Sequence, residues 1–164
     1  MSRPLTHAER QARWIALLLP AALLAGAWGS QLIGHLYPCE MCHWQRWPHY
    51  AALPFAVLAF VVPQRSIAKA FVILAALLIA VSGAIGVVHA GVEYHWWNGF
   101  TACTQTVDLR GLGPEARLEA LMKAPVVRCD VAQWSVAGIS LAGFNAILSL
   151  GGAALILWLM RRSR

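Results

Sequence analysis

The chain has 164 residues, of which 59% are hydrophobic and only 12% are charged, and its formal net charge is +6. A soluble domain carries about a quarter charged residues, so this excess of apolar side chains indicates an environment other than water. The positive charges lie at the chain ends and in one short loop rather than on a basic face with interleaved aromatic residues. The composition predicts a single membrane domain over residues 1–164 and argues against nucleic-acid binding.

Four long apolar stretches follow one another at about 14–36, 43–62, 67–90 and 134–160. A helix needs roughly 20 residues to cross the hydrocarbon core of a bilayer. The second stretch is the shortest and contains two prolines, of which we expect Pro48 in the first helical turn, where a missing N–H costs little. The pattern predicts an all-α integral membrane protein, an up-and-down bundle of four transmembrane helices with outer loops at about 37–42 and 91–133.

Lysine and arginine in the short flanking segments predict the orientation, because they gather on the cytoplasmic side of membrane proteins. The outer loops are close to neutral, and the other side carries Arg3, Arg10, Arg13, Arg65, Lys69, Arg161, Arg162 and Arg164. We therefore expect both termini on the cytoplasmic side of a bacterial inner membrane and the cysteines in periplasmic loops. The sequence leaves the oligomeric state open, with a monomer as the default. A signal peptide cleaved near Ala25-Gly26-Ala27 is the alternative for the first stretch, and it leaves the cysteines on the same side.

The second outer loop contains a short amphipathic helix over Pro114–Lys123, with proline and glutamate at its start and lysine at its end. Leu118, Leu121 and Met122 share one face of this helix. That face could rest on the membrane surface or pack on the protein itself, and the sequence does not separate the two arrangements.

Cys39 and Cys42 form a Cys-x-x-Cys motif at the entry to the second helix. Residues three apart on a helix share a face, and the positive end of the helix dipole favours a thiolate. Arg46 follows one turn after Cys42, where it could stabilise that thiolate and donate hydrogen bonds to a carbonyl oxygen. The pair closes a very small loop and so contributes little as a staple, which favours a redox role.

Cys103 and Cys129 form the second pair, far apart in the same outer loop. Such a pair is usually a staple that orders a long loop, but two neighbouring pairs can also exchange disulfides by thiolate attack. Four cysteines can pair in three ways, and the sequence leaves the resting pairing open.

Two other interpretations of the first pair remain. With His43 it matches Cys-x-x-Cys-His, the attachment signal for c-type haem, which predicts a small membrane-anchored cytochrome. A metal site of His35, Cys39, Cys42 and His43 has suitable spacing, although oxidising conditions disfavour free thiolate ligands. A membrane scaffold with one stapled loop is a third, non-enzymatic hypothesis.

The remaining histidines divide into one site candidate and several anchors. His89 lies near the outer end of the third helix, where it could line a pocket with Arg46. We expect His35, His49 and His95, like most of the tryptophans, to be anchors at the membrane interface.

Three segments resemble the disulfide bond formation protein B (DsbB) family. They are Pro38-Cys39-Glu40-Met41-Cys42-His43-Trp44-Gln45-Arg46, then Trp96-Trp97-Asn98-Gly99-Phe100-Thr101-Ala102-Cys103, and Cys129-Asp130 with Trp134. The resemblance covers essentially the whole chain, including its helix pattern and loop lengths. His43 directly after the second cysteine is not part of the family pattern.

The resemblance implies a thiol:quinone oxidoreductase that reoxidises a periplasmic thioredoxin-fold dithiol oxidase of the DsbA type. Carried over to this chain, Cys103 takes the mixed disulfide with that partner and Cys129 is its pair. Electrons then pass to Cys39 and Cys42, and from Cys42 beside Arg46 to a membrane quinone, either ubiquinone or menaquinone. His89 is carried over as a second residue of the quinone site.

Overall fold

The computed structural model describes residues 5–104, 110–111, 113–123 and 127–162, and this part of the chain is mostly helical. Four long helices dominate it: α1 (His7–Leu32), α2 (Glu40–Val61), α3 (Arg65–Glu93) and α5 (Leu141–Arg162). The short elements are a 3-10 turn at Ala102–Thr104, α4 (Pro114–Lys123), and strands β1 (Ser135–Val136) and β2 (Ile139–Ser140). Arg3 and Arg164, which entered the charge argument, lie outside the described residues.

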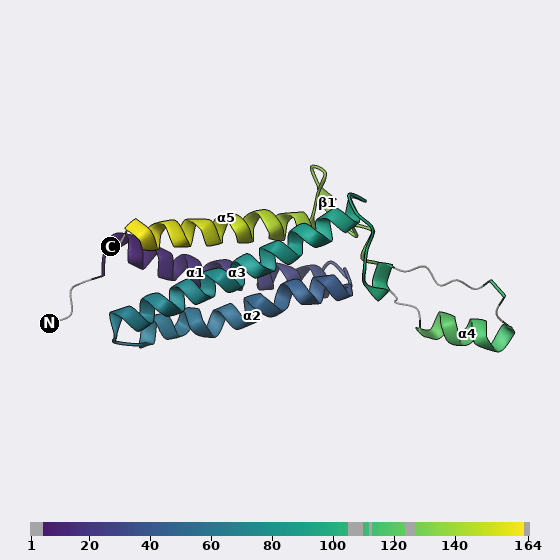
Figure 1. The fold of residues 1–164 in the computed structure, drawn as a ribbon, viewed down its shortest axis with the longest axis horizontal. Helices are drawn as coiled ribbons and strands as arrows, with labels where there is room; N and C mark the ends of the chain where they lie inside the picture. The colour runs from purple at the N-terminus through teal and green to yellow at the C-terminus, as the bar shows by residue number, and fades with distance from the viewer. Residues whose placement is uncertain (1–4, 105–109, 112, 124–126, 163–164) are drawn as a thin grey trace.

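The long helices lie side by side along one axis (Figure 1), and each packs against two neighbours in the cyclic order α1, α2, α3, α5. Small side chains from all four helices form the main core, among them Ala16, Ala56, Ala76 and Ala153. Small residues allow helix backbones to approach closely, which is how helices pack where no water drives them together. A second, smaller core at the other end contains the cysteines.

Helix α1 begins with a capping box, in which Thr6 and Glu9 exchange side-chain to backbone hydrogen bonds. The Glu9 carboxylate is buried, and it also accepts from Arg65 Nε at 3.0 Å and pairs with Lys69 Nζ at 2.9 Å. These contacts join the start of α1 to the start of α3. The basic residues of both segments therefore lie at one end of the bundle, opposite the cysteines.

Three helices of the described chain are long and apolar enough to cross a membrane, namely α1, α3 and α5. Helix α2 does not meet that criterion, although it runs beside them for 22 residues. Its first half carries Gln45, Arg46 and His49, which lower its apolar character and point into the site described below.

The structure corrects several helix boundaries. Helix α1 begins at His7, not near residue 14, because its first two turns are polar but well capped, and it ends at Leu32, ahead of His35 with its positive φ of 53°. Helix α5 begins at Leu141, not at residue 134. A two-residue turn with positive φ at Ala137 and Gly138 folds residues 135–140 into a β-hairpin first.

Two further expectations concern the position of Pro48 and the helix in the second outer loop. Pro48 lies more than two turns into α2, not in its first turn, because Cys39 already caps the helix. Helix α4 occupies the residues expected for the loop helix, and Leu118, Leu121 and Met122 are all exposed. Its apolar face does not pack on the bundle in this structure.

Candidate functional site

The start of α2 positions the first cysteine pair. Cys39 is the N-cap residue, and its sulfur accepts a hydrogen bond from the backbone N–H of Cys42 at 3.3 Å. This local bond brings the two Sγ atoms to 2.9 Å from each other. Cys39 is buried and Cys42 is half-buried, and both are free thiols here. A pair at this separation needs only a small movement to close into a disulfide.

The second pair, Cys103 and Cys129, is joined in a disulfide. The backbone N–H of Cys129 also donates to the carbonyl oxygen of Cys103 at 3.2 Å, so the two loop segments around these cysteines are held together at this point. Both residues are almost fully buried. Next to Cys129, Arg128 forms an exposed ion pair with Asp130, and its hydrogen bonds hold the pKa of the Asp130 carboxyl below its usual value.

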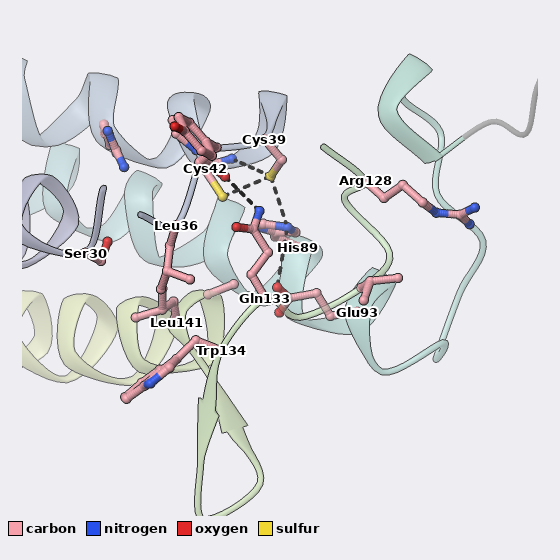
Figure 2. A pocket seen from close by; sticks show the side chains of 15 residues that line it. Ser30, Leu36, Cys39, Cys42, His89, Glu93, Arg128, Gln133, Trp134 and Leu141 are labelled. Atoms are coloured by element: carbon pink, nitrogen blue, oxygen red, sulfur yellow. Dashed lines mark hydrogen bonds and ion pairs between the residues drawn. The ribbon is translucent and has the colours of Figure 1, made fainter. Parts of the chain in front are cut away.

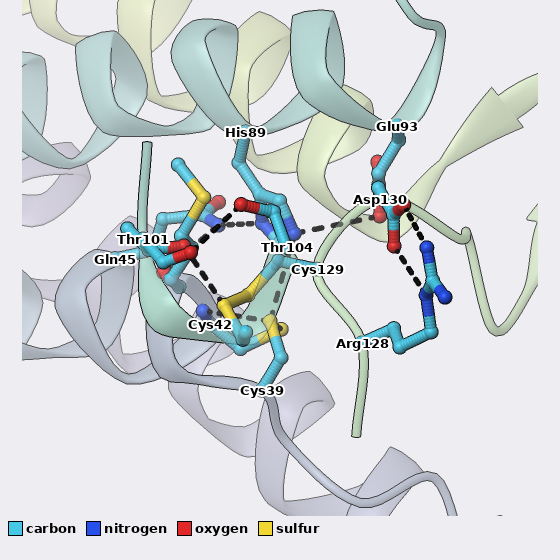
Figure 3. The surroundings of a disulfide bond; sticks show 12 residues. Cys39, Cys42, Gln45, His89, Glu93, Thr101, Thr104, Arg128, Cys129 and Asp130 are labelled. Carbon is cyan, nitrogen blue, oxygen red and sulfur yellow. Dashed lines mark hydrogen bonds and ion pairs between the residues drawn. A yellow bond between two sulfur atoms is a disulfide. The ribbon is translucent and has the colours of Figure 1, made fainter. Parts of the chain in front are cut away.

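The two pairs belong to one cluster. Cys39, Cys103 and Cys129 pack together with Met41 and Val92, and Cys42 lies against the same group. Figure 3 shows Cys39 and Cys42 directly beside the disulfide, below the His89 side chain. The fold therefore brings together all four cysteines that the sequence singled out, from the start of α2 and from the loop between α3 and α5.

His89 of α3 lies beside the first pair, with Nε2 at 3.5 Å from Cys39 Sγ. Its other ring nitrogen, Nδ1, is 2.7 Å from Gln45 Nε2. The same Gln45 nitrogen is 3.3 Å from the carbonyl oxygen of Met41, which can only accept, so the amide N–H₂ faces both groups. It follows that His89 Nδ1 accepts and that the ring proton is on Nε2, facing Cys39.

Glu93, one turn after His89, is a buried carboxylate that the sequence reading counted only as a charge. Its Oε1 lies 3.7 Å from His89 Nε2, and its Oε2 accepts from the Ser140 hydroxyl. The hairpin β1–β2 supplies that serine, and Tyr94 OH accepts from the Ser140 backbone N–H at 2.8 Å. The hairpin thus supports an acid group beside His89, and the spacing of four residues between His89 and Glu93 is the sequence signal that could have identified it.

Arg46 is buried and turns toward the end of α1. Its NH1 donates to Gln31 Oε1 at 2.9 Å and its NH2 to the carbonyl oxygen of Ala27 at 3.1 Å, while its guanidinium lies 5.6 Å from the Trp28 ring centre. A guanidinium has five N–H donors, so these two bonds leave donors for another group. Arg46 and Cys42 line the same two cavities, as the spacing of four predicted.

Two cavities meet at Cys42. A small one of about 50 Å³ is bordered by Cys39, His89 and Glu93 as well as by Gln133 and Trp134 (Figure 2). A larger one of about 230 Å³ lies between α1, α2 and α5. Apolar residues such as Leu24, Ala27 and Phe144 form most of its wall, and its polar groups are Cys42, Gln45, Arg46, His49, Asn145 and Ser30. A mostly apolar cavity with a few convergent polar groups is typical of a small-molecule site.

His49 was expected to be an interfacial anchor, and this is wrong. Its side chain is 3% exposed, in the interior of the bundle, with Nε2 at 3.0 Å from Asn145 Oδ1. Ser82 and Ser149 complete a buried polar cluster around the ring. The sequence signal that could have identified it is the spacing of His49 from Cys42, seven residues or two turns along the same face of α2.

The site does not favour the metal interpretation. Cys39, Cys42 and His89 are the described residues close enough to hold a metal ion together, so His35 and His43 are not part of that group. A histidine that binds metal through Nε2 normally donates its Nδ1–H to an acceptor. Here Nδ1 faces the N–H₂ group of Gln45 instead.

Comparison with known proteins identifies a family that matches most of the chain. The model of the family described as disulfide bond formation protein DsbB matches residues 9–159, which is nearly the whole chain. Among curated proteins, the chain is similar to an uncharacterized protein of Rickettsia prowazekii (strain Madrid E), with 21% identity over 137 residues. That alignment covers 83% of this chain and 78% of the relative. No solved structure matches the chain.

Proposed function

This chain belongs to the disulfide bond formation protein DsbB family, and on that premise we propose that it is a thiol:quinone oxidoreductase. Its partner would be a periplasmic thioredoxin-fold dithiol oxidase of the DsbA type. The observation that carries the proposal is the position of Cys42. Its sulfur lies 2.9 Å from Cys39, inside the cysteine cluster, and the residue also borders the 230 Å³ cavity beside Arg46.

The reaction begins at the second pair. A thiolate of the reduced partner attacks the disulfide between Cys103 and Cys129, and the partner leaves oxidised while both cysteines become thiols. These thiols in turn reduce a disulfide between Cys39 and Cys42. The packing of Cys39 against Cys103 and Cys129 in one cluster supports this exchange, because the two cysteine pairs already lie next to each other.

The second half-reaction returns the Cys39–Cys42 pair to its disulfide. A quinone bound in the larger cavity supplies the oxidant, since it takes up two electrons and two protons from the dithiol. Arg46 donates hydrogen bonds to a ring oxygen and favours negative charge near Cys42. His89 directs its Nε2–H at the Cys39 sulfur, so it stabilises the Cys39 thiolate while the disulfide with Cys42 forms.

The cavity fits such a ligand. Its wall is largely apolar, its lining residues all belong to α1, α2 and α5, and most of its polar groups come from α2. A flat ring with an isoprenoid tail requires this combination, because the ring needs hydrogen bonds and the tail needs lipid. The residues do not discriminate between ubiquinone and menaquinone.

We propose that α2 crosses the membrane together with α1, α3 and α5, with both termini cytoplasmic and the cysteine loops periplasmic. The ion pairs of Glu9 with Arg65 and Lys69 support this, because they place a basic cluster at the end of the bundle opposite the cysteines. Labelling of single introduced cysteines at residues 64 and 113 with a membrane-impermeant reagent, in a cysteine-free background, tests it. Only the second position should react from the periplasm.

The activity is tested with purified protein, a reduced thioredoxin-fold dithiol partner and a short-chain ubiquinone or menaquinone, by following quinone absorbance. Cys42→Ser and Cys103→Ser should each abolish turnover. The two variants differ when the protein is first reduced with dithiothreitol, which is then removed. Cys103→Ser should still reduce one quinone per protein, whereas Cys42→Ser should reduce none. Absence of turnover with either quinone, from protein whose four cysteines are intact, would contradict the proposal.

A further inference from the structure

His49 carries an atom that the protein itself does not satisfy. Nδ1 is the one buried side-chain nitrogen or oxygen of the described residues that has no hydrogen-bond partner. The residue is 3% exposed and lines the 230 Å³ cavity. A buried polar atom without a partner is costly, and in a residue that lines a cavity it suggests that a ligand supplies the missing partner.

The orientation of Asn145 determines which ring nitrogen of His49 carries the proton. Asn145 Nδ2 lies 3.2 Å from the carbonyl oxygen of Ser82, which can only accept, and it donates to Gln45 Oε1 at 2.8 Å. The amide oxygen Oδ1 therefore faces His49 Nε2 at 3.0 Å. Since an amide oxygen can only accept, Nε2 must be the donor.

The two serines agree with this assignment. The Ser82 hydroxyl donates to the carbonyl oxygen of Gln45 at 2.7 Å, so toward His49 Nε2, 2.9 Å away, it presents a lone pair. The Ser149 hydroxyl donates to Asn145 Oδ1 at 3.0 Å. A neutral imidazole has one N–H, and here it is on Nε2. Nδ1 is consequently an acceptor, and none of the described residues donates to it.

The cavity thus has two unlike polar groups on one face of α2. The Arg46 guanidinium can only donate hydrogen bonds. Because the His49 ring proton is on Nε2, His49 Nδ1 can only accept one. The two residues are three positions apart in the sequence, which is a rise of about 4.5 Å along the helix. The two groups can therefore address different oxygen atoms of one ring-sized ligand.

We propose that His49 accepts a hydrogen bond from a hydroxyl group of the reduced, hydroquinone form of the ligand. This rests on the proposed function, and it adds a residue that selects between the two oxidation states. When the dithiol becomes a disulfide, its two electrons and two protons pass to the ring, whose oxygens become hydroxyls. One hydroxyl then donates to Nδ1. The oxidised ring has only carbonyl acceptors, so it leaves Nδ1 unsatisfied.

The consequence is tighter binding of the reduced form. A hydrogen bond that satisfies a buried acceptor corresponds to about tenfold in affinity. A tenfold preference for the reduced form raises the two-electron reduction potential of the bound ligand by about 30 mV. His49 therefore makes the bound quinone a stronger oxidant of the Cys39–Cys42 dithiol.

The test measures binding rather than turnover. In a Cys39→Ser/Cys42→Ser background, which exchanges no electrons, the affinities of a decyl-substituted benzoquinone and of its hydroquinone are measured by anaerobic equilibrium dialysis against empty micelles. With His49 intact, the hydroquinone should bind about tenfold more tightly. His49→Gln should remove this preference, because the glutamine amide can still donate to Asn145 but has no atom at the place of Nδ1. The quinone affinity should change less than about twofold.

Ser149→Ala is the matched control, because it alters the same network while His49 and Asn145 remain, and it should preserve the preference. A preference that survives His49→Gln, or an equal loss for both forms, would overturn the inference and leave the oxidoreductase proposal standing. Failure of the cysteine-variant protein to bind either form would overturn both. Should His49→Gln not fold, the dimethyl ether of the hydroquinone replaces it. Lacking donors, this ether should bind about tenfold more weakly than the hydroquinone.

Discussion

Gln45 and His89 are joined by a hydrogen bond of 2.7 Å between Nε2 of the amide and Nδ1 of the ring. The bond links α2 to α3 directly beneath the first cysteine pair. Since Met41 fixes the amide orientation from the other side, the bond also fixes the ring tautomer, so that Nε2–H faces Cys39. A residue that touches neither sulfur atom thus determines how the histidine meets the thiol.

We expect Gln45→Met to slow quinone reduction by about fivefold, which corresponds to the net loss of one hydrogen bond of about 1 kcal/mol. Methionine preserves the length and volume of the side chain but cannot donate to His89. The ring is then free to place its proton on either nitrogen. The ¹⁵N chemical shifts of the His89 ring should change from one defined tautomer to a mixture, and this readout separates a positioning role from a loss of packing.

Gln31→Met is the matched control for this experiment. Gln31 is also an amide near the site, but it lies on α1 and its side-chain oxygen accepts from Arg46. It should leave the ring shifts of His89 as they are. Identical ring shifts in Gln45→Met and in the unmodified protein would refute the role of Gln45.

The cysteines of the first pair should differ in reactivity once reduced. Cys39 is 4% exposed and packs against the loop disulfide, whereas Cys42 is half-buried and borders both cavities. With the disulfide between Cys103 and Cys129 intact, Cys42 should be alkylated at least about tenfold faster than Cys39, because the thiolate must be accessible to react. Pulsed alkylation followed by mass spectrometry of the peptides measures the two rates.

A Cys42→Ala variant serves as the control, since it reports the rate of Cys39 alone. That rate should stay low when its neighbour is removed. Equal labelling of the two cysteines in the unmodified protein would mean that Cys39 is accessible, and the assignment of Cys42 as the residue facing the ligand would lose its basis.

The sequence predicted the family, and the family match confirms it. It also predicted four long helical segments, because long apolar runs are a strong signal, although it misplaced their ends. Helix α1 starts earlier because its polar first turns depend on a capping box rather than on hydropathy. The hairpin before α5 was missed because an alanine at positive φ, Ala137, is rare and has no signature in the sequence.

Within the site, motif spacing predicted the residues of one helix and not their partners. Cys39, Cys42 and Arg46 share a face of α2 by helix geometry alone. The same spacing places His49 on that face, two turns after Cys42, although an interfacial position was expected for it. Gln45 acquires its role from His89, a neighbour far away in the chain, so only the tertiary fold identifies it.

Glu9→Gln should destabilise the protein by about 2 kcal/mol without changing its redox activity. The carboxylate is buried and holds Arg65 and Lys69, whose side chains are 30% and 29% exposed. Breaking a buried pair costs about 3–5 kcal/mol, and partial exposure of the partners reduces this. Thermal unfolding in detergent measures the change. Thr6→Ala, which removes only the cap, should cost about 1 kcal/mol, and a larger loss in Thr6→Ala would contradict this account of Glu9.

Gly83→Ala should destabilise the contact between α3 and α5. A Cβ atom at Gly83 would lie 2.8 Å from Leu150 Cγ and 3.0 Å from the Leu150 backbone nitrogen. The side chain can shift but the backbone cannot, so the helices must separate. Overpacking of this kind costs about 1–3 kcal/mol, of which better helix propensity returns up to about 1.

Gly151→Ala in α5 is the matched substitution, because a Cβ there meets nothing within 4 Å. It should be neutral or stabilise by up to about 1 kcal/mol, since alanine favours the helix. Unfolding of both variants in the same detergent compares them directly. Because Ser149 would also lie 3.0 Å from the new Cβ of Gly83→Ala, that variant should disturb the cluster around His49 as well. Equal stability of the two variants would show that close packing of α3 on α5 does not hold the cluster in place.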